Sequence, residues 1–165
     1  MTSDLKDIDF VEMGRTCFGH AARRTANLLT RHYNRAMAEL GLELTQAQLL
    51  AVIADGTAPS ASAIARYLGI DRSTLARNLR PLEAAGLIRR RETPGRTVLP
   101  VLTAEGEQKV VEIHKAWQHA QVELTDMLGP DGADAVRAQM SALRKAVHIL
   151  EDNDARAAAN ADQTN

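Results

Sequence analysis

The sequence predicts a mainly α-helical protein with a small β-hairpin and long helices at both ends, and these end helices are candidates for dimerisation. Aromatic residues make up only 3% of the 165 residues, and alanine and leucine are abundant, a composition that favours helix over sheet. Apolar residues recur every three or four positions towards both ends of the chain, which is the spacing of an amphipathic helix. Between those regions, two short β-prone runs flank a Pro-Gly pair, which is typical of a hairpin.

Four helices are predicted before the hairpin. The first covers residues 10–40 and ends at Gly41, with one apolar stripe formed by Phe18, Ala22, Ala26, Leu29, Tyr33, Met37 and Leu40. The second begins at Thr45 as N-cap, with Gln48 completing a capping box, and stops at Asp55-Gly56. A short third helix follows Ser60 and Ser62 and runs to about Leu68, where Gly69 breaks it. A fourth, capped by Asp71 or Ser73, runs through Ala85 and contains Pro81, where a kink would fit.

The hairpin is expected from residues 87–92 and 97–102, around the turn Thr93-Pro94-Gly95-Arg96. Pro100 confines the second run to an edge strand. Thr103 then caps a long helix that ends at Gly129-Pro130. Apolar residues in 133–150 are spaced like a heptad seam, which indicates either a partner helix or packing within the chain.

These elements predict four segments. Residues 1–44 form an N-terminal helical dimerisation segment, and 45–102 form the central α/β unit. Residues 103–151 form a C-terminal helical dimerisation segment. The polar tail 152–165 is predicted to be disordered.

Positive charge is concentrated in the central unit. Residues 60–100 contain eight arginines and three acidic residues, which gives this stretch a charge of +5 and leaves −6 for the rest of the chain. A basic segment within an acidic chain indicates one surface that meets phosphate, although a solvated charged face would look the same. Arginine suits bidentate contacts with phosphate or guanine better than lysine does.

A helix-turn-helix at residues 62–86 is predicted to contact the phosphate-bearing partner. Ala65 allows two helices to approach, and Gly69 permits the turn between them. At 100° per residue, Leu75, Leu79 and Leu82 share the inner face of the second helix, and Ser73, Arg77 and Arg80 share the outer face. Such an outer face fits the major groove of DNA, where Arg77 would pair with guanine and Asn78 with adenine.

The hairpin would act as a wing on phosphate or in the minor groove. Arg89 and Arg91 share one strand face and Arg90 faces the other way. The predicted DNA-binding residues are Ser62, Arg72, Ser73, Thr74, Arg77, Asn78, Arg80, Arg91 and Arg96.

Three runs carry a family resemblance: LTQAQLLAVIADG, SASAIARYLGIDRSTLARNLRPLEAAGLIRRR and VLTAEG. Together they resemble the MarR (multiple-antibiotic-resistance regulator) family, over residues 18–128. The resemblance implies a winged-helix homodimer, held by its first and last helices, that binds a pseudo-palindromic operator. It also implies a repressor released by a small aromatic or acidic ligand, or in some relatives by oxidation. The wing loop is shorter here than in many relatives, and it lacks the aspartate that precedes their arginine.

The resemblance also implies a ligand pocket between the long helices and the DNA-binding unit. The candidate ligand-binding residues are His20, Arg24, His32, Tyr33, His114 and Trp117. Arg24 would pair with a carboxylate, and Trp117 would stack on a ring. The five histidines contain no i, i+4 metal pair, so no metal site and no cofactor are predicted, and a zinc site assembled across helices is the alternative.

Cys17, the only cysteine, suggests an alternative redox-sensing regulator. A phenylalanine follows it, as in the peroxide-sensing branch of the family, but Ala21 stands where those sensors have a tyrosine. Nearby Arg15, His20 and Arg24 would favour a thiolate, and the other interpretation is a buried packing cysteine.

Other classes of function are less well supported by the sequence. No nucleotide-binding, hydrolase or metalloprotease motif occurs, so no enzyme is predicted. A winged-helix module that binds only proteins is the remaining alternative. The N-terminus lacks the pattern of a signal peptide, and no apolar stretch reaches the ~20 residues of a membrane span, so a cytoplasmic location is predicted.

Overall fold

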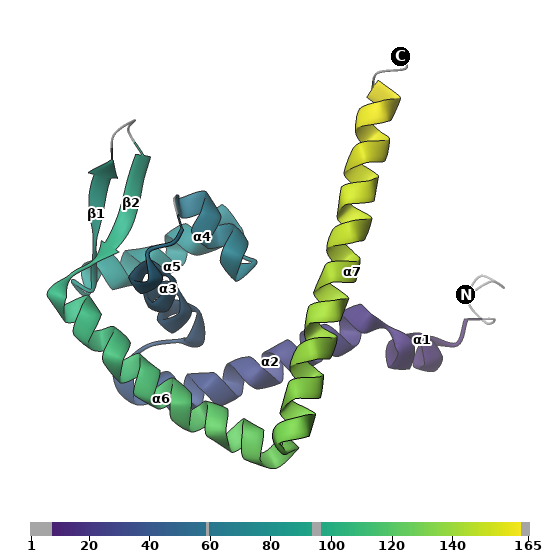
Figure 1. Ribbon diagram of the computed structural model, residues 1–165, viewed down its shortest axis with the longest axis horizontal. Helices are drawn as coiled ribbons and strands as arrows, with labels where there is room; N and C mark the ends of the chain where they lie inside the picture. Colours follow the sequence, from purple (N-terminus) through teal and green to yellow (C-terminus); the bar gives the residue numbers. More distant parts are fainter. Residues whose placement is uncertain (1–7, 59, 94–96, 163–165) are drawn as a thin grey trace. The chain divides into compact units, whose positions relative to one another are not determined.

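The computed structural model describes residues 8–58, 60–93 and 97–162, and it confirms a mainly helical fold with one antiparallel hairpin (Figure 1). In chain order the elements are α1 (Phe10–Thr16), α2 (Phe18–Met37), the 3-10 turn η2 (Ala38–Leu40), α3 (Leu44–Asp55), α4 (Ala61–Leu68), α5 (Arg72–Ala84), β1 (Ile88–Thr93), β2 (Thr97–Leu102), α6 (Ala104–Leu128) and α7 (Pro130–Asp162). The chain forms two compact units, Met1–Ala120 and Gln121–Asn165, with the boundary inside α6.

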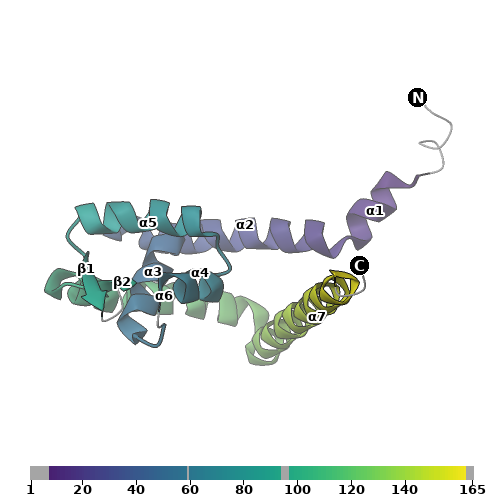
Figure 2. The same cartoon turned by 90° about the horizontal axis from the view of Figure 1, so that it is seen from above.

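Helix α3 is the centre of the first unit. It contacts α2, α4, α5 and β2, and its Leu49 and Leu50 side chains have no exposed surface. Leu82 of α5 and Met37 of α2 are also fully buried in the same cluster. Seen from above, α5 runs along one side of this unit, next to α3 and α4 (Figure 2). Burying a leucine side chain contributes roughly 1.5–3 kcal/mol, so this shared core fixes the positions of the surrounding helices.

Helices α4 and α5 form the predicted helix-turn-helix. The Ser60 hydroxyl caps α4 by accepting a hydrogen bond from the Ala63 N–H at 3.1 Å. Gly69 ends α4 with a left-handed backbone (φ 64°), a conformation that favours glycine. Asp71 then caps α5. Pro81 lies inside α5.

The hairpin pairs Arg90 with Pro100 and Arg91 with Leu99, and it projects from the helices as an arm (Figure 1). Both strands of a two-stranded hairpin are edge strands, so the missing N–H of Pro100 breaks no internal ladder. The turn residues 94–96 lie outside the described part of the chain.

The hairpin is tied to the start of α6. The Thr103 N–H donates to the Leu87 carbonyl at 3.1 Å, and the Thr103 hydroxyl donates to the Gly86 carbonyl at 2.6 Å. The same hydroxyl accepts the Gly106 N–H at 3.0 Å and so caps α6. A Cβ at Gly106 would lie 2.0 Å from the Leu87 carbonyl oxygen, so only glycine permits this approach.

The N-terminal helix predicted over residues 10–40 is broken at Cys17. Cys17 has an extended backbone (φ −70°, ψ 113°), which ends α1 and begins α2. Gly14 and Gly19 weaken helix on either side of the break, and α1 has no buried residue to stabilise it by packing. The predicted start of α3 at Thr45 is also wrong. Glu43 is the N-cap, and its N–H donates to Gln46 Oε1 at 2.9 Å.

The second unit contains the end of α6 and α7. Gly129 (φ 70°) separates the two helices, and Ala133 of α7 is buried. Disorder was predicted for residues 152–165, but α7 continues through Asp162. Five of the eleven residues 152–162 are alanine, the strongest helix former, which the polarity of the tail obscures.

Within the described residues, no single helix has the length and apolar character needed to cross a membrane. The bent pair Phe18–Leu40 and Leu44–Asp55, with 75° between its two parts, meets the length and composition criteria together. Core helices of globular proteins meet the same criteria, and α3 carries Leu49 and Leu50 in the core.

Candidate nucleic-acid interface and ligand cleft

The outer face of α5 is polar and exposed, and its inner face is buried. Leu75 and Leu82 are 3% and 1% exposed, whereas Ser73, Arg77 and Arg80 are exposed. Thr74 and Asn78 are half-buried on the flanks. The core therefore fixes the rotation of α5 about its axis and presents two arginines and a serine on one side.

A chain of hydrogen bonds runs along the start of α5 to Arg77. Asp71 Oδ1 accepts from the Ser73 hydroxyl at 2.5 Å and from the Thr74 N–H at 2.8 Å, and Oδ2 accepts from the Thr74 hydroxyl at 2.7 Å. The Thr74 hydroxyl in turn accepts from the Arg77 guanidinium at 3.0 Å. The hydrogen bonds from Ser73 and then Thr74 hold the pKa of the Asp71 carboxyl well below its usual range. Asp71 thus positions Arg77 through Thr74, a role that the sequence did not reveal beyond capping.

Asn78 is turned along the helix. Its side-chain amide donates to the Thr74 carbonyl at 2.9 Å. The Asn78 carbonyl oxygen remains able to accept a hydrogen bond, but a bidentate contact with adenine requires this amide to rotate. The contact of Asn78 with adenine stays a prediction.

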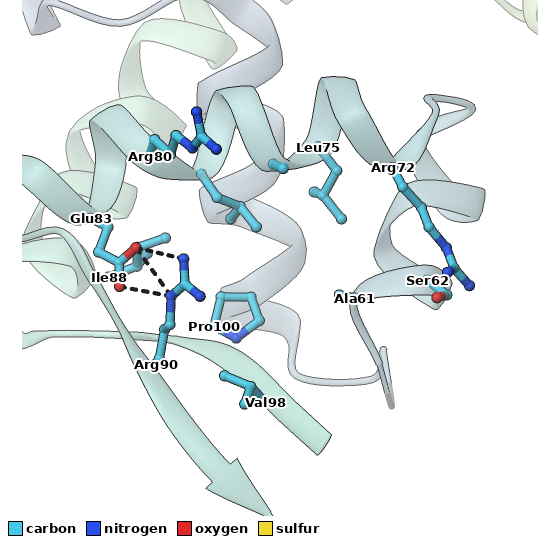
Figure 3. Close-up of a pocket in the computed structure, with 12 residues that line it drawn as sticks. Ala61, Ser62, Arg72, Leu75, Arg80, Glu83, Ile88, Arg90, Val98 and Pro100 are labelled. Carbon is cyan, nitrogen blue, oxygen red and sulfur yellow. Dashed lines mark hydrogen bonds and ion pairs between the residues drawn. The ribbon is translucent and has the colours of Figure 1, made fainter. Parts of the chain in front are cut away.

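A groove of about 360 Å³ lies between α4, α5 and the hairpin (Figure 3). At one end Arg90 Nε donates to Glu83 Oε1 at 3.0 Å and Arg90 Nη2 donates to Oε2 at 3.2 Å, which joins β1 to α5. Ser62 and Arg72 lie together at the other end (Figure 3). The Glu83–Arg90 ion pair neutralises Arg90 and directs its side chain towards α5. Sequence reasoning missed Glu83, because no periodicity links a helix residue to a strand residue across an intervening turn.

Two other arginines of the hairpin lie on β1. Arg89 and Arg91 are exposed on β1. Arg96, which was predicted to tip the wing, lies outside the described residues. The cations that the structure places around α5 and β1 are therefore Arg72, Arg77, Arg80, Arg89 and Arg91, in addition to the paired Arg90.

A second hollow, with a volume of about 590 Å³, lies between α2, α3 and α6 within the first unit and is here called the cleft. The His114 and Trp117 rings stack in its wall, with centroids 5.6 Å apart and planes 27° from parallel. Burial raises the pKa of the Tyr33 hydroxyl, so this phenol stays neutral. The lining consists of Ala26, Leu29, Thr30, Tyr33, Met37, Leu44, Thr45, Ala47, Gln48, Ala51, Val110, Ile113, His114 and Trp117.

Only half of the predicted ligand-binding residues line this cleft. Tyr33, His114 and Trp117 do, whereas His20 and Arg24 lie exposed on the earlier turns of α2 and are not part of the lining. His32 is turned away, because its Nε2 donates to the Ala120 carbonyl at 3.0 Å. Its ring meets the Tyr33 ring edge-on, with centroids 5.3 Å apart, so His32 packs against a residue of the lining without lining the cleft itself.

Cys17 is exposed at the break between α1 and α2. Its Sγ accepts a hydrogen bond from the His20 N–H at 3.5 Å, so the thiol caps α2. Cys17 is therefore not buried within a single chain, as the packing interpretation expected, and the redox role stays a prediction.

Known proteins share this architecture. The transcriptional regulator MosR of Mycobacterium tuberculosis, in complex with DNA, is 32% identical over 80% of this chain and 96% of its own, with a TM-score of 0.71. The fold is also that of the repressor CouR bound to p-coumaroyl-CoA (24% identity, 82% and 96% covered, TM-score 0.70). A MarR-family protein of Mycobacterium tuberculosis in complex with salicylic acid is similar as well (22% identity, 76% and 96% covered, TM-score 0.61).

No curated protein sequence matches the chain. A sequence model of the MarR family matches residues 40–96, which span α3, α4, α5 and β1. Together with the identity to MosR over most of both chains, this match shows that the protein belongs to the MarR family of DNA-binding transcriptional regulators.

Proposed function

We propose that this regulator is a repressor that binds a pseudo-palindromic operator as a homodimer and is released by a small molecule in the cleft. The observation that carries DNA binding is the outer face of α5, where Ser73, Arg77 and Arg80 are exposed above a buried leucine face. The crystal structure of MosR, which is 32% identical to this chain, contains DNA.

In this proposal the start of α5 enters the major groove. Arg77, oriented by Thr74, forms a bidentate contact with guanine, and Ser73 contacts a base edge or phosphate. Arg72 and Arg80 contact phosphates on either side of the groove, and Arg91 contacts the backbone from the hairpin. Ser62, Thr74, Asn78 and Arg96 complete the proposed surface.

Release follows from the two elements that the cleft shares with the DNA-binding part of the first unit. Helix α3 lines the cleft with Thr45 and Gln48 and buries Leu49 and Leu50 against the other helices. Helix α6 lines it with His114 and Trp117 and is tied to the hairpin through Thr103. A ligand that favours one arrangement of α3 and α6 would change the spacing of the two α5 helices in the dimer, which must match half-sites ~34–36 Å apart.

The remaining properties follow the same proposal. Residues 1–44 and 103–151 would form the dimer, since α7 exposes an apolar stripe that includes Val136, Met140, Leu143 and Val147. The protein would act in the cytoplasm and would not be an enzyme. A module that binds only proteins would not need Ser73, Arg77 and Arg80 on its outer face.

A DNA-binding experiment tests the proposal. Duplexes from both flanks of the protein's own coding region, and a pool selected by the protein from random sequence, are titrated across salt concentrations by fluorescence anisotropy. We expect tight binding that weakens with salt, and about a 10- to 100-fold loss for Arg77→Ala on the selected duplex. Arg23→Ala, an exposed arginine of α2, is the matched control and should bind as the wild type does. Binding that is absent or insensitive to salt, or an Arg77→Ala variant of unchanged affinity, would contradict the proposal.

A further inference from the structure

We infer that the cleft selects an uncharged, planar aromatic ligand and discriminates against carboxylates. This inference rests on the proposed function, because it specifies the ligand of the same cleft. It departs from the sequence prediction, in which Arg24 paired with an acidic ligand.

The first step is the charge of the lining. Among the described residues that line the cleft, there is no arginine, lysine, aspartate or glutamate. The ionisable lining groups are Tyr33, a phenol whose pKa burial raises further above neutral pH, and His114, which is engaged in the stack with Trp117. A carboxylate that enters such a site loses its hydration and gains no cationic partner with a fixed charge, whereas a neutral amide or carbonyl loses much less.

The second step is the shape of the aromatic wall. The His114 and Trp117 rings are stacked with their planes 27° from parallel, so a further planar group can extend this stack on α6. Trp117 is 41% exposed, which leaves part of its ring uncovered for a further planar group. Aromatic rings stack favourably in offset arrangements, so a flat ligand gains more here than an aliphatic one of equal area.

The third step is the polar part of the lining. Thr30, Thr45 and Gln48 line the cleft, and hydroxyl and amide groups both donate and accept hydrogen bonds. They suit a ligand group that does both, such as a carboxamide or a neutral phenol. A volume of about 590 Å³ lies within the range of pockets for small organic molecules and admits a ligand of one or two fused rings.

A pair of isosteric probes tests this selectivity. 2-Naphthamide and 2-naphthoate have the same ring system and differ in charge at pH 7.5. Trp117 is the only tryptophan, so its emission, corrected for the absorption and fluorescence of the naphthyl probes, reports occupancy of the cleft. We expect naphthamide to quench or shift this emission with an affinity about tenfold or more above that of naphthoate. Equal or tighter binding of naphthoate, or no response to either probe, would overturn the inference.

Two variants sharpen the test. Gln48→Arg places a cation at the cleft on an exposed position of α3, and we expect it to raise the affinity for naphthoate about tenfold without a matching gain for naphthamide, which loses the Gln48 amide as a partner. Arg24→Ala is the matched control, since Arg24 does not line the cleft, and it should leave both affinities unchanged. A Gln48→Arg variant that gains nothing for naphthoate, or an Arg24→Ala variant that loses affinity for it, would show that charge in the lining does not set the selectivity.

DNA binding by the same preparations keeps this inference separate from the proposed repressor function. If naphthamide binds while no selected duplex does, the ligand selectivity stands and the operator proposal fails. If the duplex binds while neither probe perturbs Trp117, the operator proposal stands and the ligand inference fails.

Discussion

The surface around α5 and the cleft between α2, α3 and α6 are built on the same core but in opposite ways. Around α5, charged groups are exposed and several are held in place by neighbours: Asp71 and Thr74 orient Arg77, and Glu83 holds Arg90. In the cleft, the described lining has no charged side chain of fixed sign, and an aromatic pair provides the wall. Under the proposed function, this chain separates its two binding sites by charge, with arginines facing a polyanion and uncharged groups facing a small molecule.

The two regions are joined by backbone geometry rather than by charge. Helix α6 begins against the end of the α5-to-β1 turn, where Gly106 meets the Leu87 carbonyl. Its later residues, from Val110 to Trp117, line the cleft. Thr103 adds hydrogen bonds to Gly86 and Leu87 at the same junction. Under the proposed function, a ligand-induced change in α6 would reach the hairpin through these close contacts, which have little freedom to adjust.

The largest expected effect comes from breaking this junction with Gly106→Ala. The added Cβ would lie 2.0 Å from a backbone oxygen and 3.0 Å from the Leu87 carbonyl carbon, so the backbone of the turn or of α6 must move. We expect the free energy of unfolding to fall by about 3 kcal/mol, at the upper end of the cost of overpacking, with a large drop in thermal midpoint measured by calorimetry.

Gly132→Ala is the control for the junction. Gly132 lies in α7, where a Cβ would be 3.7 Å from Leu128 Cβ, an ordinary contact. Alanine is a better helix former than glycine by about 1 kcal/mol, so this variant should be as stable as the wild type or slightly more so. A Gly106→Ala protein as stable as the Gly132→Ala protein would mean that the junction is not tight.

The helix-turn-helix was predicted well because its sequence signals are local. Helix caps, glycine turns and the leucine spacing of α5 each act within a few residues, so Ser60, Gly69 and Asp71 appear where expected. The rotation of α5 followed from 100° per residue, which holds for any regular helix. The break at Cys17 and the extension of α7 were not predicted, because they depend on weak local preferences that packing does not reinforce.

The cleft was only half predicted because its lining depends on how distant segments meet. Tyr33, His114 and Trp117 face it, but α2 is long enough that His20 and Arg24 fall beyond its edge. His32 adjoins Tyr33 in sequence yet donates to the Ala120 carbonyl instead. The Glu83–Arg90 pair is another contact of this kind, since it joins a helix to a strand.

A smaller effect is expected from Glu83→Gln, which weakens the link between α5 and β1. The side chains of Glu83 and Arg90 are 37% and 67% exposed, so we expect the free energy of unfolding to change by only about 0.5 kcal/mol. Affinity for the selected duplex should fall a few-fold, because the hairpin is held less firmly beside α5. The salt dependence should stay the same, since no phosphate contact is lost.

Two comparisons identify the role of Arg90 in that experiment. Arg91→Gln should reduce the slope of log affinity against log salt by about 0.9, as expected for one lost phosphate contact. The exchange of both charges, Glu83→Arg with Arg90→Glu, should recover most of the affinity lost by Glu83→Gln. If Glu83→Gln instead binds more tightly and with a steeper salt dependence, Arg90 is a phosphate contact that Glu83 suppresses.

The smallest expected effect is a pH-dependent loss of stability that originates at Asp71. Hydrogen bonds from Ser73 and Thr74 lower the pKa of the folded Asp71 carboxyl below its ordinary value of 3.8. A carboxyl whose pKa is lower in the folded state stabilises the protein at pH values above its pKa in the unfolded chain. This stabilisation disappears as the pH falls through the folded pKa.

The thermal midpoint of the wild type should therefore exceed that of Asp71→Asn by a constant amount between about pH 5 and 7, and the difference should shrink below about pH 4. Taking the difference cancels the titration of the other carboxyl groups, and asparagine still caps a helix. Asparagine also loses the acceptor that Oδ2 offers to the Thr74 hydroxyl, so the pH-dependent part of the difference, rather than its size, reports the Asp71 carboxyl. A difference that does not change with pH would mean that the carboxylate does not hold Ser73 and Thr74 in solution. Arg77 would then approach DNA as a flexible cation, and the α5 surface would lose the fixed geometry that distinguishes it from a merely basic patch.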